Sequence, residues 1–158
     1  YYENNNNGFE HYINYLHDYR DKNGYVYGEH FAPHDVNVRE MSSGKTRLEI
    51  ARQMGLNFTR VPRTKDKMAS IQHTRAMFSK IYIHKTECEY GIDCIMEYHA
   101  QEGINGAPGG PDHSWASHCC DALQIISDAR IEGLLPSGAA NLSGGGIHMN
   151  QWSSSNIL

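Results

Sequence analysis

The chain has 158 residues, of which 39% are hydrophobic and 20% charged, and its formal net charge is −4. This length and composition predict a single globular domain with a core of its own, and no apolar run approaches the roughly 18 residues of a membrane-spanning helix, so membrane insertion is excluded. The sequence opens on Tyr1 without a charged and apolar leader, so we expect no secretory signal and interpret the start as a cut end of something longer.

Charge is unevenly distributed along the chain. Between residues 45 and 85 there are ten Lys and Arg against two Asp and Glu, a balance of +8, and the remaining four against sixteen give −12. A basic block in an acidic chain is typical of a surface that contacts a phosphate backbone, with acids left to gather divalent cations. Solvated helix faces explain the same pattern equally well.

The N-terminal segment predicts a strand end, a turn and a helix. Residues Tyr1–Glu3 resemble the end of a strand, and Asn4–Gly8 is a turn-forming cluster. Apolar residues then recur at spacings of three and four from Phe9 to Arg20, which predicts an amphipathic helix closed by Asn23-Gly24.

A carboxylate follows the next predicted element. Residues Tyr25–Ala32 are rich in β-formers and predict a strand, which runs directly into Pro33-His34-Asp35. Asp35 therefore lies just beyond the carboxyl end of a strand, where open α/β sheets tend to carry their chemistry.

The segment Ser42-Ser43-Gly44-Lys45-Thr46 invites comparison with a phosphate-binding loop. The glycine that such a loop requires five residues before Gly44 is Arg39, so we reject that interpretation. Ser42 or Ser43 is better interpreted as the N-cap of a helix from Lys45 to Met54, with Gly55 as its stop.

The middle of the chain predicts alternating strands and helices. They are a strand in Asn57–Pro62, a helix over Lys67–Ser79, a strand over Ile81–His84 and a helix over Glu87–Ala100. Residues Gln101–Pro111 hold four glycines and two prolines and predict a mobile loop that gates a site.

A helix predicted over Ser114–Arg130 carries the second candidate acid. His118 and Asp121 are three apart and so share one side of this helix. An acid on a core-facing helix is costly unless it is paired or holds a metal, which makes Asp121 a functional candidate; a place on the solvated face is about as plausible.

We expect the domain to cover residues 1–135 and a disordered tail to cover 136–158, which is rich in Gly, Ser and Asn.

The four cysteines predict reduced thiols. Cys119 and Cys120 are adjacent, Cys88 and Cys94 are six apart, and no C-x-x-C pair is present, so the zinc templates fail. Buried thiols in a reducing compartment are the preferred interpretation.

Three motifs in order resemble the nuclease domain of phage terminase large subunits. They are Pro33-His34-Asp35, then Ser43-Gly44-Lys45-Thr46-Arg47, then Ser117-His118-x-x-Asp121-Ala122, and the similarity spans roughly Tyr1 to Leu123. The resemblance implies an α/β fold of the ribonuclease H-like kind, a mixed sheet flanked by helices, with its first strands missing from this chain.

The resemblance also implies an activity and its residues. It implies a Mg²⁺- or Mn²⁺-dependent endonuclease with a two-metal site, in which Asp35 and Asp121 are catalytic metal ligands and His118 orients Asp121 or contacts the scissile phosphate. The family's first acid would lie upstream of Tyr1. We therefore expect the 158 residues alone to bind divalent metal weakly and to cleave DNA poorly.

The partners follow from the same resemblance. The substrate is concatemeric double-stranded DNA in the cytoplasm of the host, cut with little sequence specificity because the chain has no reader of base edges. The implied protein partners are a small terminase subunit and the prohead portal, with no membrane. The residues expected to contact DNA are Lys45, Arg47, Arg63, Lys65, Lys67 and Arg75.

Several alternatives remain open. Glu3, Glu10 and Asp112 are candidate substitutes for the missing acid, and Asp112 takes the place of an acid that many relatives have where this chain has Ser114. A His/carboxylate metallohydrolase or oxygenase would use a set of four residues: His34, His113, His118 and Asp121. A third alternative is a non-catalytic DNA-docking or assembly module. A metal titration with a nuclease assay separates the three.

Overall fold

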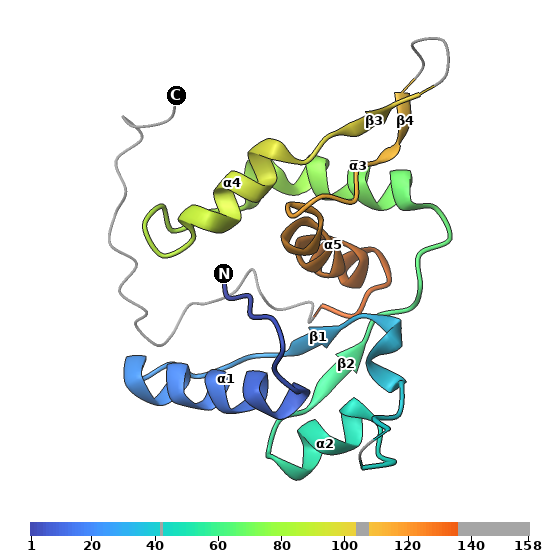
Figure 1. The fold of residues 1–158 in the computed structure, drawn as a ribbon. Helices are drawn as coiled ribbons and strands as arrows, with labels where there is room; N and C mark the ends of the chain where they lie inside the picture. Colours follow the sequence, from blue (N-terminus) through green and yellow to red (C-terminus); the bar gives the residue numbers. More distant parts are fainter. Residues whose placement is uncertain (42, 104–107, 136–158) are drawn as a thin grey trace.

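The structure is a computed structural model that describes residues 1–41, 43–103 and 108–135. The predicted tail over 136–158, residues 104–107 of the predicted loop and the candidate N-cap Ser42 lie outside the described residues. In chain order the elements are α1 (Phe9–Asn23), β1 (His30–Ala32), the 3₁₀ helix η1 (His34–Asn37), α2 (Arg47–Gln53), β2 (Phe58–Arg60), α3 (Lys67–Met77), the 3₁₀ helix η2 (Phe78–Lys80), α4 (Glu89–Glu97), β3 (Ala100–Glu102), β4 (Pro108–Pro111) and α5 (Ser117–Ile131) (Figure 1).

The architecture is mixed α/β, as the sequence predicted, with small sheets. Strands β1 and β2 pair in parallel, with His30 opposite Phe58 and Ala32 opposite Arg60, and α2 lies in the crossover between them. Helix α5 lies between this sheet and the helices α3 and α4, while α1 and α2 lie on the far side of the sheet (Figure 1). The central position of α5 gives it contacts with both halves of the molecule.

Two apolar clusters hold these layers together. Ile13 of α1, Ala51 of α2 and Leu56 are buried together, and Phe58 of β2 packs against them. On the other side of α5, Cys94 of α4 packs against the start of α5 in a second cluster. Because α5 contributes to the second cluster and also contacts β1, it connects the two clusters.

Four predicted elements are confirmed with small changes of bounds. They are the helices α1, α3 and α5 and the strand β2. Helix α1 ends as predicted, since Gly24 has φ 66°, a left-handed conformation that glycine adopts without strain, and its N–H donates to the carbonyl of Arg20.

The start of α2 differs from the prediction. Its N-cap is Thr46, whose side chain accepts from the N–H of Glu49 while the Glu49 carboxylate accepts from the N–H of Thr46. This reciprocal pair is a capping box, and its spacing of Thr-x-x-Glu in the sequence was the better signal than either upstream serine. The proposed helix start at Lys45 was therefore wrong by two residues.

The other predicted strands are shorter or absent among the described residues. Only His30–Ala32 of the predicted Tyr25–Ala32 strand is paired, and neither Tyr1–Glu3 nor Ile81–His84 forms a strand. A β-prone segment becomes a strand only where a neighbour supplies its hydrogen bonds, and that partner is not visible in local composition. Conversely, the predicted loop Gln101–Pro111 contributes the antiparallel pair of β3 and β4, and the predicted helix ending at Ala100 ends at Glu97.

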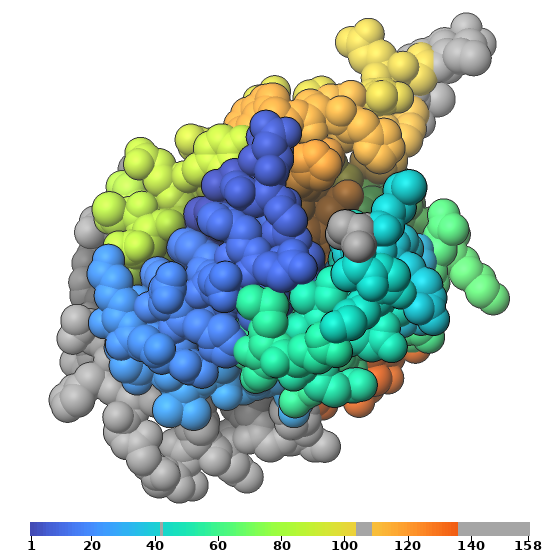
Figure 2. Space-filling model, turned by 60° about the horizontal axis from the view of Figure 1, so that its bottom comes forward, coloured from blue at the N-terminus to red at the C-terminus, as the bar shows by residue number. Residues whose placement is uncertain are grey.

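The N-terminal segment packs instead across the surface. Figure 2 shows it as a column that rises from α1 to the region of α4. Tyr1 stacks on Tyr90 with ring centroids 6.1 Å apart, and its ammonium donates to the sulfur of Cys88. A Cβ at Gly91 would lie 3.1 Å from the Cβ of Tyr1, so any other residue there would require Tyr1 to shift by a few tenths of an ångström. None of the helices in the described ranges is long and apolar enough to cross a membrane.

The first testable prediction concerns the α1–α2 core. Ile13 is fully buried, so Ile13→Ala should lower the free energy of unfolding by about 3 kcal/mol, from lost burial and the cavity left behind. Val26 is 96% exposed, and Val26→Ala should change it by less than about 0.5 kcal/mol. Urea denaturation of both variants checks the difference; equal effects would contradict this placement of the core.

Candidate functional site

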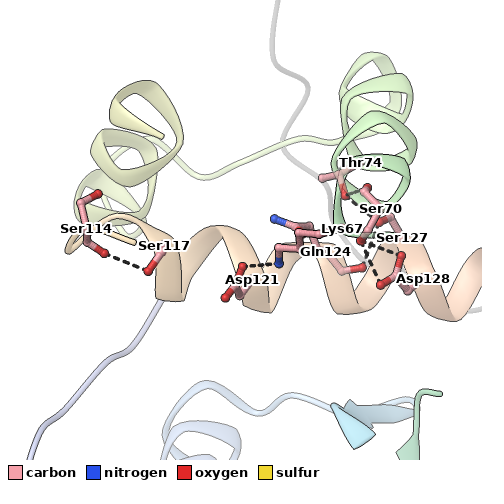
Figure 3. Close-up of polar contacts among 9 residues, drawn as sticks. All are labelled: Lys67, Ser70, Thr74, Ser114, Ser117, Asp121, Gln124, Ser127 and Asp128. Atoms are coloured by element: carbon pink, nitrogen blue, oxygen red, sulfur yellow. Dashed lines mark hydrogen bonds and ion pairs between the residues drawn. The ribbon is translucent and has the colours of Figure 1, made fainter. Parts of the chain in front are cut away.

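Asp121 lies on the side of α5 that faces α3. Its Oδ1 accepts from Nζ of Lys67 at 2.6 Å, an ion pair between residues far apart in the sequence (Figure 3). Both side chains are partly open to solvent, with 40% of Lys67 and 46% of Asp121 exposed. Asp121 is thus neither a buried unpaired acid nor a fully solvated one.

Asp35 lies where the sequence predicted it relative to the sheet. It is exposed in η1, directly after β1, and its carbonyl accepts from the N–H of Val38. Val36 is buried and anchors η1, so the backbone around Asp35 is held although its carboxylate faces solvent. Among the described residues, the Asp35 side chain has no hydrogen-bond or ion-pair partner.

The histidines of the candidate site are exposed. His118 lies one turn before Asp121 on α5, and His34 and His113 are also on the surface. Across the described ranges, no three His, Cys, Asp or Glu side chains are grouped so that they could hold a metal ion. The contact that the structure does create at Asp121 is the one with Lys67.

A buried polar seam joins α3 to α5 beside this ion pair. We use this name for Ser70, Thr74, Ser127 and Asp128, which are all at least nine-tenths buried (Figure 3). The hydroxyl of Ser70 is shared between the two carboxylate oxygens of Asp128 at 2.8 and 2.9 Å, and the hydroxyls of Thr74 and Ser127 are 2.6 Å apart. The Thr74 hydroxyl also lies within hydrogen-bond distance of the carbonyl of Ser70, and the Ser127 hydroxyl of that of Gln124. Each of the two hydroxyls has one proton, so they donate in two of these three contacts at a time.

Asp128 is a buried acid that holds α3 against α5, and the sequence did not single it out. The rule that an acid on a core-facing helix needs a partner was applied to Asp121, whereas it is Asp128 that is 8% exposed and needs one. The sequence contained a signal for this role, because Asp128 follows Asp121 by two helical turns and so lies on the same side of the helix. In the structure its neighbours Ser127 and Ala129 are buried as well.

The polar seam determines where Lys67 lies. Lys67 is the first residue of α3, one turn before Ser70, so the hydrogen bonds of the polar seam hold the start of α3 against α5. The ammonium of Lys67 then reaches Asp121 from a helix whose position is already fixed. This pairing was also missed: Lys67 was predicted to contact DNA, and Asp121 to bind metal.

The other predicted DNA contacts fall into two groups. Lys45 donates to Oε1 of Gln53 at 2.8 Å, and Arg47 forms an ion pair with Glu40 at 2.7 Å. Arg63 and Lys65, in the linker between β2 and α3, and Arg75 of α3 are exposed and form no ion pair with a described residue. The exposed cations closest in sequence to Lys67 are therefore Arg63 and Lys65.

The candidate substitute acids are distributed over three different segments. Glu3 accepts from the hydroxyl of Tyr1 at 2.6 Å, and Glu10 lies in the first turn of α1. Asp112 accepts from the amide of Gln101 at 3.2 Å, a hydrogen bond that lowers the pKa of this carboxyl. The contacts of these acids do not involve Asp35 or Asp121.

The cysteines of the helix that carries Asp121 are buried thiols. All four cysteines are free, as predicted, and Cys94, Cys119 and Cys120 are buried. Burial is the main reason that the pKa of Cys119 is raised to about 12 and that of Cys120 to about 11. Their sulfurs contact the carbonyls of Gly91 and Cys94, which ties α5 to α4.

Comparisons with protein-family models, with curated proteins and with solved structures find no match for this chain. The motifs in the sequence and the contacts described above are therefore the features of the chain that bear on its function.

A second prediction tests the polar seam. Ser70→Ala removes the hydrogen bond to a buried carboxylate and should lower the free energy of unfolding by about 2 kcal/mol. Ser79→Ala, at an exposed serine of η2, is the matched control and should change it by less than about 0.5 kcal/mol. A double-mutant cycle with Asp128→Ala should give a coupling energy above about 0.5 kcal/mol; independent effects would contradict the contact.

A third prediction concerns thiol reactivity. The thiolate is the reactive form, so the raised pKa values of Cys119 and Cys120 should leave both almost unreactive at pH 8 in the folded protein. Cys88, the least buried cysteine, should react first with a thiol-specific disulfide reagent, and Cys88→Ser should remove the fast phase. A fast phase that persists in Cys88→Ser would show that at least one of the three buried thiols is accessible.

Proposed function

We propose that the chain is the nuclease domain of a phage DNA-packaging terminase, a divalent-metal-dependent endonuclease of the ribonuclease H-like kind. The observation that carries the proposal is the placement of the two motif acids. Asp35 directly follows β1 of the parallel pair, and Asp121 is on α5, the helix that packs against β1. The sequence motifs thus fall on elements that contact each other around one parallel sheet.

The donor chemistry of these two acids fits a hard divalent cation. Mg²⁺ prefers oxygen ligands, keeps several waters and is commonly bound by one or two carboxylates together with substrate phosphates. Asp35 is exposed and Asp121 is half-exposed, so both carboxylates are open to solvent and to DNA. A cation held by these carboxylates would supply a water of lowered pKa and would neutralise charge on the phosphate.

The remaining side chains would position the substrate. His118, exposed one turn from Asp121, would hydrogen-bond the scissile phosphate or hold Asp121. Arg63, Lys65 and Arg75 offer exposed charge to the phosphate backbone, and contacts of this kind carry no base specificity. In the proposed setting the substrate is concatemeric double-stranded DNA in the host cytoplasm, with a small terminase subunit and the prohead portal as partners.

The fourth prediction tests the two acids. Asp35→Asn and Asp121→Asn keep the shape of each side chain but remove its charge, so each should reduce Mn²⁺-dependent nicking of supercoiled plasmid by the natural full-length protein at least a hundredfold. Asp93→Asn, at an exposed acid of α4, is the matched control and should nick like the unaltered protein. Full activity of either motif variant would remove that acid from the site.

One observation favours a second candidate, the non-catalytic DNA-docking module. The ion pair with Lys67 neutralises Asp121 without any metal. A docking module would bind duplex DNA equally well with EDTA and with Mg²⁺, and it would leave plasmid uncut at any metal concentration. The nicking assay with its matched control separates the two functions.

A further inference from the structure

We infer that the cavity between α3, α4 and α5 binds a small aromatic carboxylate that carries one ring N–H. The cavity has a volume of about 210 Å³, and its walls come from these three helices and from Ala100 and Pro111, where β3 begins and β4 ends. The inference goes beyond the proposed nuclease, since neither Asp35 nor Asp121 lines this cavity.

The volume of the cavity limits the size of the ligand. An engineered apolar cavity of about 150 Å³ takes up benzene, whereas pockets for drug-sized ligands begin at about 300 Å³. A cavity of about 210 Å³ therefore suits one ring, or two fused rings, with a short substituent. Water is a poorer filling, because each buried water needs about two to four polar partners and aliphatic walls offer none.

The walls of the cavity favour an aromatic ring. Ile71 of α3, Ile95 of α4 and Leu123 of α5 are apolar and only partly buried, so a ligand can cover them. Met68 and Phe78 are 43% and 37% exposed, and they add a thioether and a ring, which both make favourable contacts with aromatic groups. A flat ring placed here would remove apolar surface of all three helices from water.

The wall formed by α5 contains a buried acceptor. Gln124 is 3% exposed, its side chain leaves α5 toward α3 and α4 (Figure 3), and its Oε1 is buried without a hydrogen-bond donor among the described residues. Such an oxygen is rare in folded proteins, because it has lost its hydration without compensation. The terminal amide of glutamine turns with little restraint, so a small rotation presents Oε1 to the cavity without breaking a hydrogen bond of this oxygen.

One ring N–H of the ligand would supply the donor that this oxygen lacks. Among the described residues that line the cavity, only Gln124 has a buried polar atom without a partner. A nucleobase would bring several polar atoms against walls that cannot pair them, which costs affinity. A ring with a single donor therefore fits this lining better.

A cation lies where the cavity meets the solvent. Arg75 of α3 lines the cavity, is exposed and forms no ion pair with a described residue. A guanidinium binds a carboxylate through two parallel hydrogen bonds. The described lining residues include no Asp or Glu, so no acid in the wall competes for Arg75. The carboxylate of the ligand would thus lie beside Arg75, with its ring against the apolar walls.

The first arm of the test compares three probes on the unaltered chain. Indoleacetate has both the N–H and the carboxylate, N-methylindoleacetate lacks the N–H, and indole lacks the carboxylate. Each is titrated into the isotope-labelled full chain and followed by NMR. Indoleacetate should bind with a dissociation constant below about 1 mM and give nuclear Overhauser effects to the methyl groups of Ile71, Ile95 and Leu123. The other two probes should each bind about five- to tenfold more weakly.

The second arm removes the two polar groups of the site. Gln124→Leu should weaken indoleacetate about five- to tenfold and leave N-methylindoleacetate at least as tightly bound, because only the N–H depends on the amide. Arg75→Gln should weaken indoleacetate by a similar factor and leave indole unchanged. Arg130→Gln, at an exposed arginine of α5 outside the lining, is the matched control and should bind all three probes like the unaltered chain.

Three outcomes would overturn the inference. The site is wrong if indoleacetate gives no saturable shift, or if its nuclear Overhauser effects reach only methyl groups outside the cavity. The assigned chemistry is wrong if the unaltered chain binds N-methylindoleacetate or indole as tightly as indoleacetate. It is also wrong if Gln124→Leu retains the preference for the N–H. Thermal melts of the variants check their folding, and the comparison of probes on the unaltered chain needs no variant at all.

Discussion

The carboxylate of Asp128, buried between α3 and α5, constrains how these two helices pack against each other. A buried carboxylate must be hydrogen-bonded, and its donor here is the hydroxyl of Ser70, one turn from the start of α3. A second contact, between the hydroxyls of Thr74 and Ser127, fixes the position of α3 along the axis of α5. Apolar contacts alone would tolerate sliding of one helix on the other, whereas these hydrogen bonds select one arrangement.

The packing of α3 on α5 also determines which residues meet at the candidate site. Asp121 and Asp128 are two helical turns apart on α5, and α3 meets both, one through Lys67 and the other through Ser70. The two acids differ in environment rather than in type. Asp128 is buried and hydrogen-bonded to α3, while Asp121 is about half exposed and paired with Lys67. The same pair of helices therefore carries a buried hydrogen-bonded contact and a solvent-exposed ion pair side by side.

The helices were easier to predict from the sequence than the strands. The element on which a candidate residue lies was easier to predict than the side chain that it contacts. The periodicity of α1 and α3 and the glycine stop of α1 are local properties, so they are readable without a structure. Whether Tyr25–Glu29 pairs with a neighbour depends on segments distant in the chain. The pair of β3 and β4 is local, but the glycines and prolines of Gln101–Pro111 favoured a loop over strands. Likewise Asp35 after β1 and Asp121 on a helix were predictable, but the choice of Lys67 as the partner of Asp121 required the crossing of α3 over α5.

The polar seam joins segments that are far apart in the sequence. Ser70 and Asp128 are 58 residues apart in the sequence, so their hydrogen bond forms only after a large loop has closed. The cluster of Ile13, Ala51 and Leu56, by contrast, draws on the first third of the chain and needs less closure. Asp128 is hydrated in the unfolded chain, and its hydrogen bond to Ser70 replaces that lost hydration only once α3 lies on α5.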